Sequence, residues 1–79
     1  MRYYIHVQDG AEMLDEDGIE LSGMEAVRLE AIQASAELLK GQHGAHFWSG
    51  EPWKLWVTDQ PKGGGTTVLK LTFSAQQQA

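Results

Sequence analysis

Three stretches of the chain alternate between apolar and polar residues, while one stretch has the periodicity of an amphipathic helix. The alternating stretches are residues 2–8, 53–58 and 66–73, and the helical stretch runs from about residue 22 to residue 40. We predict an α+β domain of order β-α-β-β, with one helix packed on one face of an antiparallel or mixed sheet of three or four strands. One helix cannot cover both faces, so the other face should meet water or a partner.

The helical stretch has predicted ends and a predicted core-facing side. Ser22 and Glu25 have the spacing of a capping box, in which each side chain bonds the backbone of the other residue. Gly41 is placed to end the helix because glycine reaches positive φ without a steric penalty. The core-facing stripe is predicted to contain mostly apolar residues, namely Met24, Val27, Ala31, Ile32, Ser35, Leu38 and Leu39.

Glycine, proline and aspartate mark the predicted turns. Asp9-Gly10 ends the first strand, and Asp17-Gly18 fits either a short extra hairpin before the helix or an extended loop. Residues 41–52 are predicted to form a loop that folds back. Residues 59–65 should join the last two strands into an antiparallel hairpin.

Length and composition favour one small, soluble domain spanning residues 1–79, with residues 75–79 as a frayed tail. The chain has no cysteine, so extra stability would have to come from helix packing or from a second subunit. The N-terminus enters a strand pattern directly rather than a signal peptide, and no apolar run approaches the ~18 residues of a membrane helix. We therefore expect a cytoplasmic protein that does not bind a membrane.

Charge is distributed unevenly between two parts of the chain. The formal net charge is −5, and seven of the eleven carboxylates lie between residues 9 and 25. Three of the six basic residues instead lie in predicted strands beside large aromatic or histidine side chains. The candidate contact residues on this uncovered sheet face are Arg2, Tyr4, His6, Lys54, Trp56 and Lys70.

Three interpretations of that sheet face stay open. Two copies of the chain could meet around a two-fold axis, through such faces or through edge strands. The face could instead be solvated, with lysine stems covering cross-strand aromatic pairs. Interleaved cations and aromatics can also bind single-stranded nucleic acid, although the net charge of −5 opposes it.

The chain is similar to a family of short bacterial proteins of unknown function. The resemblance covers most of the chain and rests on R-Y-Y-I-H-V at residues 2–7, Asp9-Gly10, D-E-D-G-I-E-L at residues 15–21, the Ala- and Glu-rich helix, V-T-D at residues 57–59 and L-K-L-T-F at residues 69–73. Residues 41–52 and 61–65 depart from the family pattern. The resemblance implies a fold and no catalytic residues.

Motifs for metal, cofactor or nucleophilic chemistry are incomplete. Residues 15–18 resemble a calcium loop, but Met13 and Met24 occupy positions where an EF-hand needs carboxylates. His43 and His46 supply only half of a zinc site, and Ser49 lies near His46 in a loop with nothing to orient it. We therefore expect no metal, no cofactor and no enzymatic activity.

Together these features predict a non-enzymatic domain that acts through protein–protein contact as a homodimer. The alternative is a regulator that contacts nucleic acid through the basic and aromatic sheet face. The role of the segment from His43 to Pro52 is left open by the sequence.

Overall fold

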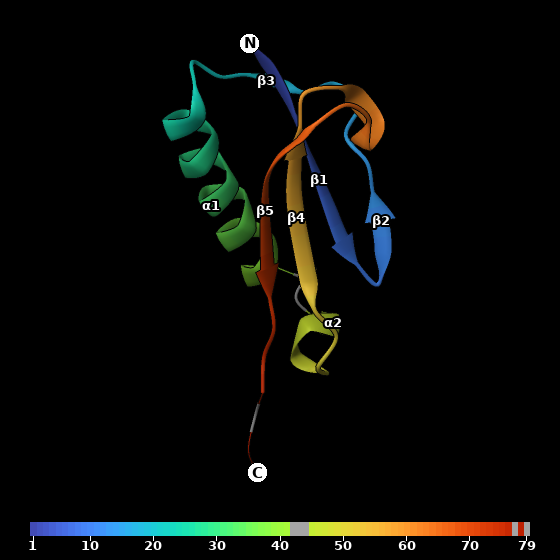
Figure 1. Cartoon of the computed structure of the whole chain (residues 1–79). Coiled ribbons are helices and arrows are strands. Elements are labelled where there is room, and N and C mark those ends of the chain that lie inside the picture. Colours follow the sequence, from blue (N-terminus) through green and yellow to red (C-terminus); the bar gives the residue numbers. More distant parts are fainter. Residues whose placement is uncertain (42–44, 77, 79) are drawn as a thin grey trace.

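The computed structural model describes residues 1–41, 45–76 and 78. Its elements are β1 (Arg2–Asp9), β2 (Ala11–Met13), β3 (Ile19–Glu20), α1 (Met24–Lys40), α2 (Ala45–Trp48), β4 (Trp53–Thr58), the 3-10 turn η2 (Pro61–Gly63) and β5 (Thr67–Phe73). The strands form one antiparallel sheet in the order β2-β1-β4-β5, with β3 paired to β1, and α1 lies along one side of it (Figure 1). The predicted α+β class is confirmed.

The hydrophobic core lies between α1 and one face of the sheet. Its fully buried or nearly buried apolar residues are Tyr3, Val7, Val27, Ala31, Trp53, Leu55 and Val57. Small residues on α1 allow the helix to approach the sheet closely. The buried Ser35 hydroxyl donates a hydrogen bond to the Ala31 carbonyl at 2.7 Å. Such a hydroxyl can be buried because it keeps a hydrogen-bond partner.

The predicted core-facing stripe of α1 is wrong at two positions. Val27, Ala31 and Ser35 are buried, whereas Ile32 is 54% exposed and Met24 is 37% exposed. The buried residues are spaced by four, so they form one narrow row along the helix. Ile32 follows Ala31 by one residue, which rotates it by about 100° away from the sheet.

The predicted capping box at the start of α1 is also wrong. Gly23 occupies the N-cap position, and no side chain of the described residues forms a capping hydrogen bond there. Ser22 therefore lies one residue too early to bond the first turn. The entry to the helix is fixed instead by the backbone, because the N–H of Leu21 donates to the carbonyl of Met1 at 3.0 Å. Gly41 does end the helix, but in an extended conformation with φ of −90°.

The short extra strands do not pair with each other, so a hairpin across Asp17-Gly18 is not formed. Val7 is opposite Met13 in β2, and Tyr3 is opposite Ile19 in β3, so both segments pair with β1. Between these two pairs, the three residues 4–6 of β1 correspond to the five residues 14–18 of the partner segment. The two extra residues let residues 14–18 leave the sheet plane.

The two predicted loops contain short helical turns. Residues 45–48 of the first form α2, and residues 61–63 of the second form η2, in which Lys62 has φ of 60°. The second loop joins β4 and β5 in the predicted antiparallel hairpin, with a register shift at Val57 and Thr58. Among the described residues, no helix is both long enough and apolar enough to cross a bilayer.

Candidate functional site

The sheet face opposite α1, here called the outer face, contains most of the predicted contact residues. The strand register places Trp56 between His6 on β1 and Lys70 on β5, and it places Lys54 opposite Gln8. Arg2 lies near the start of β1, away from this group. The outer face divides into a part covered by residues 14–18 and η2 and a part that stays open.

His6 belongs to the covered part and is completely buried. Its Nδ1 accepts the backbone N–H of Asp15 at 3.0 Å, and its Nε2 lies 2.8 Å from Oγ1 of Thr58. Because Nδ1 accepts, the proton of the neutral ring is on Nε2 and is donated to Thr58, whose hydroxyl donates to the Gln60 carbonyl at 2.7 Å. Burial lowers the pKa of His6, against the opposing charges of Asp15 and Glu12.

Asp15 joins the acidic segment to the rest of the fold. Its carboxylate accepts three backbone N–H groups, from Ile5 at 3.1 Å, from Asp17 at 3.1 Å and from Gly18 at 3.2 Å. Its carbonyl accepts the N–H of Lys62 at 2.9 Å. Burial alone would raise the pKa of Asp15, but the donors from Gly18, Ile5 and Asp17 outweigh it and lower the pKa. This acidic residue is therefore structural.

Tyr4 is half-buried, and the turn at Gly18 lies against its ring. A Cβ on Gly18 would lie 2.7 Å from a Tyr4 ring carbon and 2.8 Å from the Tyr3 carbonyl, and the φ of Gly18 is +71°. Only glycine fits this turn without strain. Tyr4 therefore contributes to the covered part of the outer face.

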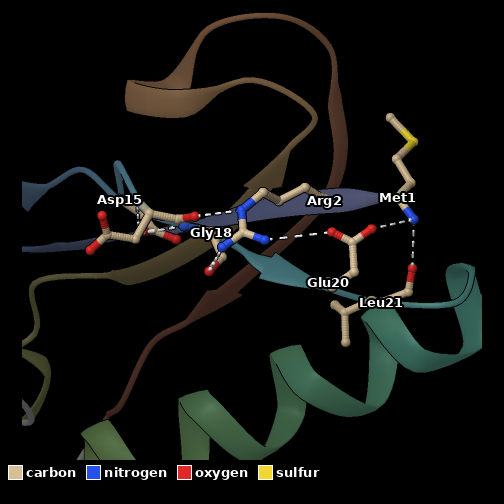
Figure 2. A network of polar contacts seen from close by, with 7 residues as sticks. Met1, Arg2, Asp15, Gly18, Glu20 and Leu21 are labelled. Carbon is tan, nitrogen blue, oxygen red and sulfur yellow. Dashed lines mark hydrogen bonds and ion pairs between the residues drawn. The ribbon is translucent and has the colours of Figure 1, made fainter.

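Arg2 binds its own chain rather than extending freely into solvent (Figure 2). Its Nε donates to the carbonyl of Asp17 at 2.7 Å, and its Nη1 lies 3.5 Å from the carboxylate of Glu20. The N-terminal amino group of Met1 lies 3.1 Å from the same carboxylate. The hydrogen bond from the Met1 amino group lowers the pKa of Glu20 most, desolvation opposes it, and the charges of the amino group and of Arg2 lower the pKa further.

The open part of the outer face forms a recess of about 240 Å³ lined by Gln8, Glu12, Lys54, Trp56, Thr67 and Lys70. The Trp56 ring lies 5.4 Å from the buried His6 ring, tilted by 42°. Three of the predicted contact residues, Lys54, Trp56 and Lys70, are thus brought together. The alternation pattern did not identify Glu12 and Thr67, because their positions in the recess depend on strand pairing.

A second, larger hollow of about 590 Å³ lies on the solvent side of α1. It is lined by Ser22, Glu25, Ala26, Arg28, Leu29 and Ile32. Leu29 is 60% exposed. The sequence pattern did not indicate this surface, because the predicted core-facing stripe of the helix was too broad and included Ile32.

The predicted histidine pair cannot be placed. His43 lies outside the described residues, and so does the side chain of His46. Among the residues that the structure describes, no group of three histidine, aspartate or glutamate side chains is arranged to hold a metal ion.

The protein is a small α+β domain. On the covered part of its outer face lies the buried hydrogen-bond network of His6, Asp15 and Thr58, and on the open part lies the recess around Trp56. Residues 2–74 match a protein family described as Domain of unknown function (DUF6894). The chain belongs to this family, which confirms the predicted membership of a family without an assigned function. No curated protein and no solved structure matches the chain significantly.

Proposed function

We propose that the protein is a non-enzymatic domain that acts through protein contact and forms a homodimer by pairing the β5 strands of two copies. Within the described chain, β5 is a seven-residue strand that pairs only with β4 and lies at the edge of the sheet (Figure 1). The opposite edge is divided into the short strands β2 and β3. A long edge strand offers unpaired backbone groups to another strand.

The hydrogen-bonding direction of each strand follows from one contact at β1. In an antiparallel pair, alternate residues direct their N–H and C=O groups to opposite sides. The N–H of Ile5 donates to Asp15 instead of to Val57, its opposite residue in β4. The hydrogen-bonded pairs of β1 and β4 are therefore the flanking ones, such as His6 with Trp56.

The same alternation identifies the free groups of β5. The N–H groups of even-numbered β4 residues point to β1, so those of odd-numbered β4 residues point to β5. Leu55 and Leu71, which are opposite each other, therefore form a hydrogen-bonded pair. The backbone groups of Lys70 and Thr72 therefore point away from β4. They are available to a second strand without any change in the fold.

A two-fold axis at Leu71 gives the most favourable antiparallel register. Lys70 of each copy then exchanges backbone hydrogen bonds with Thr72 of the other copy, so the two Lys70 residues are not directly opposite. Leu71 faces Leu71, and Leu69 faces Phe73, on the side of the core. These three residues are half-buried in the single chain, and pairing would cover them further.

The solution mass of the protein and of matched Thr72 variants tests this proposal. We expect a dimeric mass by size-exclusion chromatography with light scattering at about 100 μM, because assembly depends on concentration. Thr72→Pro removes one outward N–H that β4 does not use, and it should give a monomer. Thr72→Ala keeps that N–H and should stay dimeric.

Two further variants distinguish the other surfaces. Trp56→Glu and Leu29→Ser should both remain dimers under β5 pairing. A monomeric mass for the unmutated protein would contradict the proposal, as would a dimer that persists in Thr72→Pro. A loss of dimer only in Trp56→Glu or only in Leu29→Ser would assign the interface to the outer face or to α1.

One observation favours nucleic-acid contact as a second candidate function. Lys54 and Lys70 flank Trp56 on the open part of the outer face, an arrangement suited to a phosphate and a stacked base. If this candidate is correct, Lys54→Ala and Lys70→Ala should each flatten the salt dependence of oligonucleotide binding by about one unit of slope. Absence of binding at low salt would exclude it.

A further inference from the structure

We propose that the recess on the outer face binds a small ligand made of one planar ring, with an anionic group on one side and a hydrogen-bond donor on the other. Side chains from four strands converge on it, namely Glu12 of β2, Gln8 of β1, Lys54 and Trp56 of β4, and Thr67 and Lys70 of β5. Its volume of about 240 Å³ lies below the roughly 300–1,000 Å³ of sites for drug-sized molecules, which favours a one-ring ligand.

The ring of the ligand would stack on Trp56. This side chain is half-buried, and its ring centroid lies 5.4 Å from that of His6, its cross-strand neighbour. His6 is itself fixed by its hydrogen bonds to Asp15 and Thr58. The indole is therefore held beside a fixed polar network, as a binding platform requires, and it contributes an aromatic surface to the lining of the recess.

The anionic group would bind between the two lysines. Lys70 lies directly opposite Trp56 in the register, and Lys54 precedes Trp56 by two residues on the same face of β4. Among the described residues, neither lysine forms an ion pair, whereas Lys62 lies 3.3 Å from the carboxylate of Glu16. Two unpaired cations in a protein of net charge −5 offer charge-assisted hydrogen bonds to a carboxylate or a phosphate.

The opposite side of the recess accepts hydrogen bonds. Glu12 is opposite Gln8, and Gln8 is in turn opposite Lys54, so the charge changes from negative on β2 to positive on β4 and β5. A carboxylate accepts hydrogen bonds, which selects a donor such as an aromatic amine at this end. The site lies within one chain, and it does not depend on dimer formation because β5 pairing uses backbone groups.

Binding can be measured by two-dimensional ¹H–¹⁵N NMR with 4-aminobenzoate, benzoate and aniline as matched probes. We expect 4-aminobenzoate to bind more tightly than either probe that lacks one group, and to shift the indole N–H signal of Trp56. Lys54→Ala and Lys70→Ala should each weaken binding about tenfold or more, as loss of a charged hydrogen bond does. Lys62→Ala removes the same charge outside the recess and should leave the affinity unchanged.

Glu12→Gln tests the polarity of the site. This change should reduce the preference for 4-aminobenzoate over benzoate while the affinity for benzoate is kept or increased. Dispersed spectra of each variant would show that the fold is retained. The proposal would be overturned by no saturable shift at millimolar 4-aminobenzoate, by equal losses in Lys62→Ala, or by salt-steep binding of a single-stranded oligonucleotide without binding of 4-aminobenzoate.

Discussion

Asp15→Asn tests the structural role of the acidic segment most sharply. The amide keeps the shape of the carboxylate but places an NH₂ group where Oδ2 accepts the N–H of Ile5. A part-buried donor left without an acceptor costs about 1–3 kcal/mol. The hydrogen bonds that the N–H groups of Asp17 and Gly18 donate to Asp15 also lose their charged acceptor. This second loss costs less than the first, because the turn is partly solvated. We therefore expect a loss of about 2–3 kcal/mol.

Urea unfolding followed by circular dichroism measures this loss. For a domain of this size, with a slope of about 1 kcal/mol per molar urea, the midpoint should fall by about 2 M. Glu16→Gln is the matched control, because it changes the same charge at an exposed ion pair with Lys62 and should cost less than about 1 kcal/mol. A midpoint of Asp15→Asn close to that of the unmutated protein, or an equal loss in Glu16→Gln, would refute the role of Asp15.

Three further predictions concern single residues. Burial lowers the pKa of His6 in the folded protein below its ordinary value of 6.5. Between the folded-state pKa and 6.5, the folded protein therefore binds fewer protons than the unfolded chain. Stability should thus rise with pH through this window and fall as pH drops through the folded pKa, and NMR titration should place the His6 midpoint below 6.5. Gly18→Ala should cost about 2 kcal/mol or more in thermal unfolding, from positive φ and from the clash with Tyr4. Ser22→Ala should change stability by less than about 0.5 kcal/mol, because Ser22 does not cap α1.

The elements with strong periodicity could be predicted from the sequence. The alternation at residues 2–8, 53–58 and 66–73 correctly predicted the three long strands β1, β4 and β5, because side chains in a strand alternate between the two faces of the sheet. The helix was correctly placed but its start was not. A capping box requires a specific backbone conformation at Ser22, and the sequence does not show that Gly23 takes the cap position instead.

The candidate site could be predicted only in part. Lys54, Trp56 and Lys70 were grouped correctly because neighbouring strands form a hairpin. The burial of His6 and the attachment of Arg2 to the acidic segment depend on a two-residue insertion between β2 and β3, which no local pattern reveals. The resemblance of residues 15–18 to a calcium loop also did not indicate that the Asp15 carboxylate accepts the N–H of Ile5 in β1.

Site-specific cross-linking tests the β5-paired dimer most directly, because the chain contains no cysteine. In the proposed register the two Leu71 residues form a non-hydrogen-bonded pair with Cα atoms about 4.5 Å apart, within reach of a disulfide. The two Thr72 residues would be about 8 Å apart, beyond that reach. Under mild oxidation, Leu71→Cys should form a covalent dimer rapidly, and the more exposed Thr72→Cys should not. Cross-linking of Thr72→Cys at an equal or higher rate would contradict the proposed dimer.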